Sequence, residues 1–116
     1  MVAADVASGV VRSPVLVVNP SDPPAVRAVP MSASSLDVLR TLMRKTVQSG
    51  AGTAAQVSGA SVYGQVGLVQ TGTGSHRIWE SWFVGYRGDL AFTVIEFGKT
   101  AQLSAAALTA EFLHLL

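Results

Sequence analysis

Residues 79–97, WESWFVGYRGDLAFTVIEF, contain the clearest structural signal in this chain. Two strand-like segments, Trp79 to Tyr86 and Leu90 to Phe97, are joined by Arg87-Gly88-Asp89, a connection short enough for a hairpin. A further segment of this kind, Ser61 to Val69, precedes them. These three segments predict an antiparallel sheet of about three strands. Because successive side chains of a strand point to opposite faces, Phe92 and Val94 are expected to share a face with Glu96.

Two helices are expected beside this sheet. The first begins after a cap at Ser34 or Ser35 and runs to about Ser49, where Gly50 ends it. Its apolar face comprises Leu36, Leu39, Leu42, Met43 and Val47. Its cations, expected on the other face or near its C-terminal end, are Arg40, Arg44 and Lys45. The second helix, Ser104 to Leu116, has Leu108, Phe112 and Leu116 along one side. The predicted fold class is α+β, with the C-terminal helix packed on the sheet.

The N-terminal third gives weaker signals. Met1 to Ala7 is predicted to form the last turns of a helix that ends at Ser8 and Gly9. Val15 to Val18 is a short β-branched run, and Pro20 to Pro30 is predicted as an extended surface connector. Because Met1 to Val11 lacks a basic region followed by a long apolar one, we expect no signal or anchor in this chain. No stretch approaches the ~20 apolar residues of a membrane span.

Composition excludes several classes of function. The chain has 116 residues, of which 49% are apolar and 13% charged, with a formal net charge of +1 and no cysteine. This length fits one domain or part of one. The apolar content argues against intrinsic disorder, and the balanced charge gives no field to attract nucleic acid. The absence of cysteine excludes disulfides, thiolate catalysis and cysteine-based zinc sites.

Motifs for metals, phosphates and hydrolysis are missing as well. His76 and His114 have no second ligand at a suitable spacing, so we expect no metal and no cofactor. No G-x-S-x-G element is present to carry a nucleophilic serine. The Gly98-Lys99-Thr100 run resembles the end of a phosphate-binding loop, but Thr93 occupies the position of its first glycine. A turn into the C-terminal helix is the better interpretation.

Several conspicuous side chains have both a structural and a functional interpretation. The aromatic residues of the second strand, which could form a ligand platform, are expected mainly in the core; they are Trp79, Trp82, Phe83 and Tyr86. Arg77 and Arg87 are expected as solvated strand ends rather than anion clamps. Glu96 could be a carboxylate in a cleft, but a surface-facing or paired side chain is the commoner outcome.

The order of the segments resembles one known family. The stretches LMRKTVQSGAGTAAQ (42–56), SVYGQVGLVQ (61–70) and SWFVGY (81–86) resemble the C-terminal part of a penicillin-binding protein transpeptidase domain. Met43, Val47 and the Gly52-Thr53-Ala54 turn match the helix and turn before the family's K-T-G strand, and Trp82 to Tyr86 retains W-F-V-G-Y intact. The resemblance covers nearly the whole chain. It implies that residues 1–116 are a partial, incomplete transpeptidase-like domain.

The resemblance also locates a substrate site. Gln65, Val66, Gly67 and Leu68 stand where the family has Lys-Thr-Gly-Thr, on a strand that borders the cleft. The implied ligands are D-alanyl-D-alanine stem peptides and β-lactams, and the implied partner is a missing N-terminal part of the domain. Nucleic acid and a membrane span in this chain are not expected. An alternative register places the motif at Gln70 to Gly74, but the first preserves the preceding V-x-G and the spacing from Gly52.

Departures from the family's motifs shape the expected function. S-x-x-K is absent, because the residues three before Lys45 and Lys99 are Leu42 and Glu96. S-x-N is absent, because the sole asparagine, Asn19, follows Val17 by two positions. The expected function is a fragment of a cell-wall D,D-transpeptidase that works at the extracytoplasmic face of the membrane. Alone, it should have no catalytic residue and be inactive. The alternative is a non-catalytic binding module derived from that fold.

Overall fold

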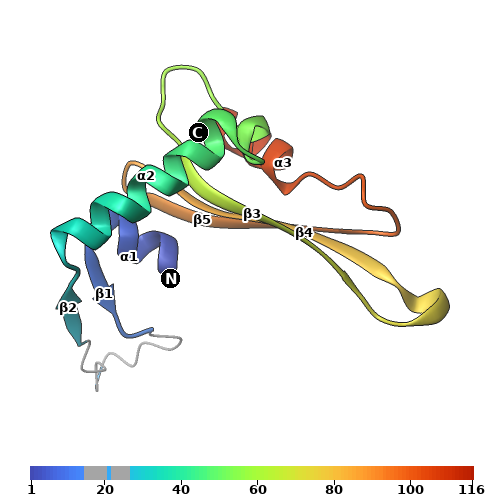
Figure 1. Ribbon diagram of the computed structural model, residues 1–116, viewed down its shortest axis with the longest axis horizontal. Coiled ribbons are helices and arrows are strands. Elements are labelled where there is room, and N and C mark those ends of the chain that lie inside the picture. Colours follow the sequence, from blue (N-terminus) through green and yellow to red (C-terminus); the bar gives the residue numbers. More distant parts are fainter. Residues whose placement is uncertain (15–20, 22–26) are drawn as a thin grey trace.

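The computed structural model describes residues 1–14, 21 and 27–116 (Figure 1). The strand predicted at Val15 to Val18 and most of the predicted connector lie outside the described residues. The last residues of the predicted connector form a strand instead: β2 (Ala28–Pro30) pairs antiparallel with β1 (Val10–Arg12). Ahead of this hairpin, α1 (Val2–Ser8) ends at Gly9, whose φ of 73° is the left-handed conformation that glycine adopts without strain. The predicted N-terminal helix is confirmed.

A three-stranded antiparallel sheet forms the centre of the fold. Its strands are β3 (Tyr63–Thr71), β4 (Ile78–Arg87) and β5 (Leu90–Gly98), in the order β3-β4-β5. The predicted hairpin between β4 and β5 is present, with Arg87 opposite Leu90. β3 begins and ends two residues later than predicted. The three-stranded sheet and the C-terminal helix confirm the predicted α+β class.

One face of the sheet is covered by α3 (Ala105–His114) and forms the main core. Phe83 is fully buried there, stacked on Phe92 with ring centroids 6.0 Å apart. Its ring lies over the cross-strand pair Gly64 and Gly85: a Cβ on Gly64 would fall within the ring, and one on Gly85 would collide with both the ring and Tyr63 O. The two glycines therefore create the space that Phe83 occupies.

The buried side of α3 differs from the prediction. The residues facing the core are Ala105, Ala106, Thr109 and Leu113. The predicted apolar stripe is left partly open, since Leu108 and Phe112 are each 37% exposed. Small residues let the helix approach the sheet closely, and Thr109 is compatible with burial because its hydroxyl donates to Ala105 O at 2.8 Å. Leu108 and Phe112 lie at the margin of that contact.

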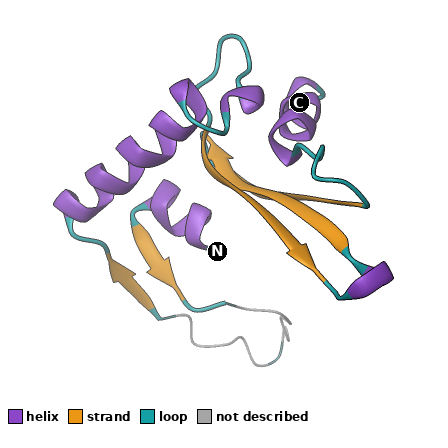
Figure 2. Cartoon of the chain, turned by 45° about the vertical axis from the view of Figure 1, so that its right-hand side comes forward, coloured by secondary structure: helices purple, strands orange, loops and turns teal. Residues whose placement is uncertain are grey.

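The opposite face is covered only at one end, by α1 and by α2 (Ala33–Ser49) (Figure 2). There Tyr63 stacks on Tyr86 at 4.8 Å, against Val6 and Met43. α2 begins earlier than predicted, because Ser32 is its N-cap: the Ser32 hydroxyl accepts the N–H of Ser35 at 3.2 Å. Capping by that hydroxyl fixes where the helix starts.

The structure also corrects the predicted distribution of polar and apolar side chains around α2. Arg40 and Arg44 were predicted on the face opposite the apolar one or near the C-terminal end of the helix, but both are half-buried. Their guanidinium groups donate to backbone carbonyls of α1 and of the segment before β3. Leu42, predicted on the apolar face, is 51% exposed. The contacts with α1 and β3 rotate the buried side of the helix toward its arginines.

Candidate functional site

The segment Gln65 to Leu68 lies on a strand at the edge of the sheet. β3 pairs with β4 on one side, and within the described residues no other strand pairs with it. α2 crosses the beginning of this strand (Figure 1). An edge strand carries unpaired backbone N–H and C=O groups, which form a template for pairing with another extended chain. The structure thus gives these residues the position that strand addition requires.

Gln65 is exposed and oriented by α2. The Thr46 hydroxyl, at the crossing of helix and strand, lies 3.3 Å from Gln65 Oε1 and 3.1 Å from Leu42 O. Within the described chain the Gln65 side-chain amide N–H groups have no acceptor, so the residue presents neutral donors beside the strand edge. Such a donor can hydrogen-bond to a carboxylate but lacks the ion-pair attraction that a lysine ammonium adds.

Gly67 is covered by an aromatic ring on its own side of the sheet. Trp82 is its register partner on β4, and a Cβ at Gly67 would fall within the Trp82 indole. Trp82 remains 36% exposed, so the ring forms a partly open apolar surface beside the strand. Any larger residue at position 67 would displace this ring.

Val66 and Leu68 face the other side, toward a cavity. The cavity has a volume of about 330 Å³ and lies between β3 and the beginning of α3, with Leu103 and Ala106 among its lining residues. Leu68 is 49% exposed at its mouth. At its base, the Ser81 hydroxyl accepts the N–H of Ala105 at 3.0 Å. The strand edge is therefore bordered by an apolar cavity that could take a small side chain.

The remaining side chains considered from sequence have structural roles. In the aromatic group Phe83 and Tyr86 are buried, Trp79 is half-buried and Trp82 is the most exposed, as expected for a group that is mainly core.

Glu96 accepts the N–H of Ser104 at 2.8 Å, at the start of α3, so it is a paired carboxylate. The expectation for Arg87 was wrong: this half-buried residue donates to Leu113 O at 3.0 Å and secures the end of α3.

Electrostatic features near the strand are few. Within the described residues no ion pair is formed, and the one acidic side chain beside the far half of β3, Glu80, accepts a hydrogen bond from Thr71 at 2.9 Å. Burial raises the pKa of the Tyr86 phenol, an effect that the nearby Arg40 guanidinium partly offsets. In this part of the chain no cluster of histidine or acidic side chains could hold a metal ion. None of its helices has the length and apolar character needed to cross a bilayer.

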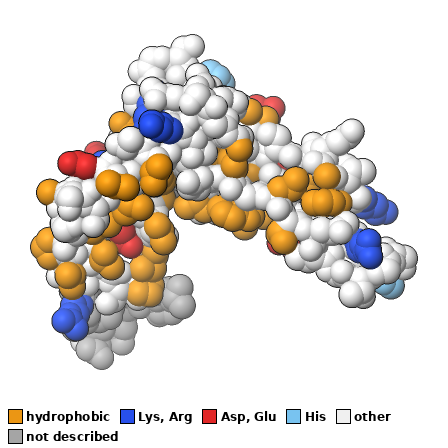
Figure 3. Space-filling model, in the orientation of Figure 1, with side chains coloured by type: hydrophobic (Ala, Val, Ile, Leu, Met, Phe, Trp, Pro, Cys, Tyr) orange, Lys and Arg blue, Asp and Glu red, His pale blue; other side chains and the backbone are white. Residues whose placement is uncertain are grey.

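A large apolar surface lies beyond the end covered by α1 and α2. The exposed large side chains on this face of the sheet are Val69, Ile78, Trp82, Ile95 and Phe97. Figure 3 shows hydrophobic side chains along the sheet and on the N-terminal part opposite it, around a hollow. Contiguous exposed apolar patches of this kind, rather than single exposed residues, are typical of interaction surfaces.

Sequence reasoning missed three neighbours of the candidate segment: Thr46, Trp82 as the cover of Gly67, and the cavity beside Leu68. The pairing of Trp82 with Gly67 follows from the β3–β4 register, which depends on where the intervening turn begins. No sequence signal gave the contact of Thr46 with Gln65, because it depends on how α2 crosses the sheet. The alternative motif position, Gln70, lies on the same strand opposite Trp79.

Comparison with known proteins agrees with this architecture. Residues 1–111 match the penicillin binding protein transpeptidase domain family. No curated protein sequence matches significantly. A crystal structure of an Atopobium parvulum protein assigned as a peptidoglycan glycosyltransferase superposes with a TM-score of 0.71 at 20% identity, over 95% of this chain and 30% of that one. The present chain thus spans about a third of that protein's length. Because the family match extends over almost all of its residues, the chain belongs to the penicillin-binding protein transpeptidase domain family.

Proposed function

We propose that this chain supplies the substrate-strand side of a peptidoglycan D,D-transpeptidase. In this role an extended stem peptide ending in D-alanyl-D-alanine pairs with the free edge of β3 at Gln65 to Leu68. The supporting observation is that this segment lies on β3, an edge strand whose only strand partner among the described residues is β4, and that it extends beyond the contact of Thr46 with Gln65. Main-chain hydrogen bonds would supply affinity, and the cavity beside Leu68 would accept a methyl-sized side chain.

The side chains of Gln65 to Leu68 carry no charge, so we expect them to bind a peptide substrate weakly. Gln65 provides neutral amide donors, and Val66 and Leu68 replace the hydroxyl groups that the family resemblance leads one to expect. We therefore expect this strand to position a peptide main chain without a strong clamp on its terminal carboxylate. β-Lactams, as ligands of the same family site, are expected to bind here non-covalently at most.

We further propose that the 116 residues on their own form no acyl-enzyme. Acyl transfer in this family needs a serine activated by a lysine, and the S-x-x-K and S-x-N patterns do not occur in this sequence. The altered K-T-G segment supports a second candidate, a non-catalytic binding module that has kept the sheet. The reading frame upstream of Met1 discriminates between the two, since an in-frame S-x-x-K and S-x-N would contradict the binding module.

The test is an amide chemical-shift map of the chain, recorded while an acetylated D-alanyl-D-alanine peptide is added. We expect shifts centred on residues 65–68, and much smaller ones with the matched L-alanyl-L-alanine peptide. Shifts centred on 70–74 would favour the alternative register, and no shift on β3 would refute the proposed site. Fluorescent penicillin should leave no covalent label. A labelled band at 12.0 kDa that disappears on replacement of one serine would overturn the proposed inactivity.

A further inference from the structure

The cavity beside Leu68 has room for an apolar side chain but offers no opposite charge to an anion. It has a volume of about 330 Å³ and lies against the strand edge at which the peptide is proposed to pair. Among the described residues that line it, the polar side chains are those of Ser81 and Ser104, and both are uncharged. A ligand carboxylate placed here would lose water without gaining an ion pair.

The start of α3, which borders this cavity, is already occupied by groups of the protein. A helix N-terminus attracts anions because its first N–H groups lack partners within the helix. Here the Ser104 N–H donates to Glu96 Oε2 at 2.8 Å. The Ala105 N–H donates to the Ser81 hydroxyl at 3.0 Å, and the Ala107 N–H donates to the Ser104 hydroxyl at 3.2 Å. The protein's own carboxylate therefore takes the place that a terminal carboxylate of a ligand could have taken.

Glu96 also places a negative charge beside the cavity. It is the register partner of Ser81, so its side chain leaves the sheet next to a residue of the cavity lining. In the part of the chain that the structure describes, no cation forms an ion pair with Glu96. A second carboxylate in the cavity would be repelled by this charge, and the low dielectric constant between helix and sheet strengthens that repulsion.

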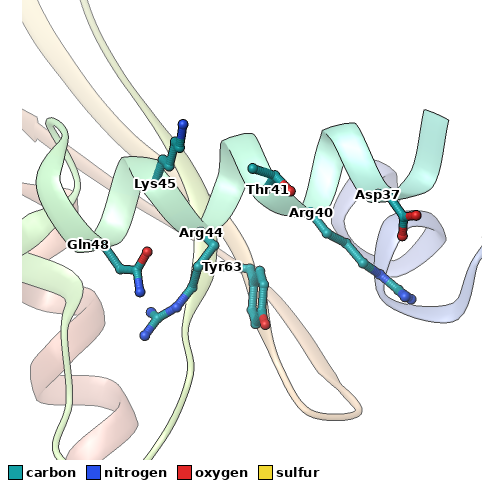
Figure 4. A pocket seen from close by; sticks show the side chains of 7 residues that line it. All are labelled: Asp37, Arg40, Thr41, Arg44, Lys45, Gln48 and Tyr63. Atoms are coloured by element: carbon teal, nitrogen blue, oxygen red, sulfur yellow. The ribbon is translucent and has the colours of Figure 1, made fainter. Parts of the chain in front are cut away.

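The cations of α2 do not replace the missing charge at position 65. The contact of Gln65 with this helix is made by Thr46. Figure 4 shows Arg40 extending toward α1, and Lys45 pointing to the opposite side of the helix from Arg44. The Arg44 guanidinium donates at 3.0 Å to a backbone carbonyl of the segment before β3. The strand edge therefore presents the neutral amide of Gln65 without a neighbouring cation from α2.

On the basis of the pairing proposed above, we propose that the β3 edge selects an extended, uncharged peptide segment and that a free terminal carboxylate weakens its binding. The peptide main chain pairs with β3, and an apolar side chain enters the cavity. The hydroxyl protons of Ser81 and Ser104 are suited to a neutral acceptor such as a peptide carbonyl. A stem peptide would thus bind through an internal stretch or an amidated terminus. A lysine at position 65 would give the reverse preference.

The experiment compares two ligands that differ in this charge alone, acetyl-D-alanyl-D-alanine as the free acid and as its C-terminal amide. Amide chemical shifts of residues 65–68 in the full chain, at constant ionic strength, give the two dissociation constants. We expect the amide to bind about threefold more tightly or better, because repulsion by Glu96 acts on the acid alone. An acid that binds as tightly as the amide would overturn this selectivity and leave the pairing at β3 standing. Absence of shifts on β3 with both peptides would refute the pairing, and the selectivity with it.

Three substitutions test the role of Glu96. Glu96→Gln removes the charge but keeps an oxygen to accept the Ser104 N–H, so the acid should then bind as tightly as the amide. The matched control, Glu111→Gln, removes the same charge from an exposed position later on α3 and should leave the preference unchanged. Gln65→Lys, which leaves α3 intact, adds a cation at the strand edge and should favour the acid. An unchanged preference in both the Glu96 and Gln65 variants, or equal changes in the Glu96 and Glu111 variants, would overturn the proposal.

Discussion

The exposed apolar face of the sheet gives the most direct prediction, that the chain alone associates through it. We expect replacement of Ile95 and Phe97 together by threonine to abolish most of this association. Both residues point away from α3, and they are 54% and 62% exposed. Threonine keeps a β-branched side chain suited to a strand, so β5 should remain intact.

The magnitude follows from these exposed fractions. Fully burying a large apolar side chain is worth about 1.5–3 kcal/mol, so covering the exposed part of each of these two contributes about 1–2 kcal/mol. Together the two side chains account for about 2–3 kcal/mol per copy, or about 4–6 kcal/mol for the two copies of a symmetric dimer, so their loss weakens the dimer by about 10³- to 10⁴-fold at 1.4 kcal/mol per factor of ten.

Sedimentation equilibrium over a range of concentrations would measure this change. The matched control is Val29→Thr, which removes a similarly exposed apolar side chain, 48% exposed, from the small β1–β2 sheet. It should leave association unchanged. A wild-type chain that is monomeric at all concentrations would refute the reasoning, as would an Ile95/Phe97 double variant that associates as tightly as the wild type.

Two further predictions concern the core. Phe83→Ala should lower the free energy of unfolding by about 3–5 kcal/mol, because the flanking glycines Gly64 and Gly85 have no side chains to fill the cavity. Urea unfolding monitored by tryptophan fluorescence measures this free energy. A loss below about 1 kcal/mol would contradict the packing described for Phe83. The raised pKa of Tyr86 means that the unfolded chain ionises first, so stability should be complete below about pH 10 and fall as the pH rises above it. Ultraviolet titration of the wild type and of Tyr86→Phe isolates the Tyr86 transition, which should lie above pH 10.0.

Much of the fold was predictable because its signals are local. The alternation in 90–97 correctly separated half-buried Phe92, Val94 and Glu96 from the exposed side chains between them. Glycine at position 9 marked the end of α1, and the short link after Arg87 marked the hairpin. These features depend on steric rules that act within a few residues, so a single sequence contains them.

The buried sides of the helices were less predictable. A helical pattern shows which residues share a face, but α2 and α3 each meet more than one neighbour. Arg40 and Arg44 turn inward because carbonyls at the end of α1 and before β3 need donors, and those carbonyls come from distant segments. Because α3 packs close to the sheet, its small alanines are buried against the strands, whereas Leu108 and Phe112 lie at the margin of the contact.

The candidate site likewise has features that the sequence predicted and features that it did not. The family motif, its departures at Gln65 and Val66, and the three antiparallel strands that carry them could be inferred from the residues alone. The packed structure was needed to show that Gln65 meets Thr46, that Trp82 covers Gly67 and that β3 has no second strand partner among the described residues. The reason is physical: spacing along the chain is set by covalent geometry, whereas contacts between a helix and a strand are set by how the whole core packs.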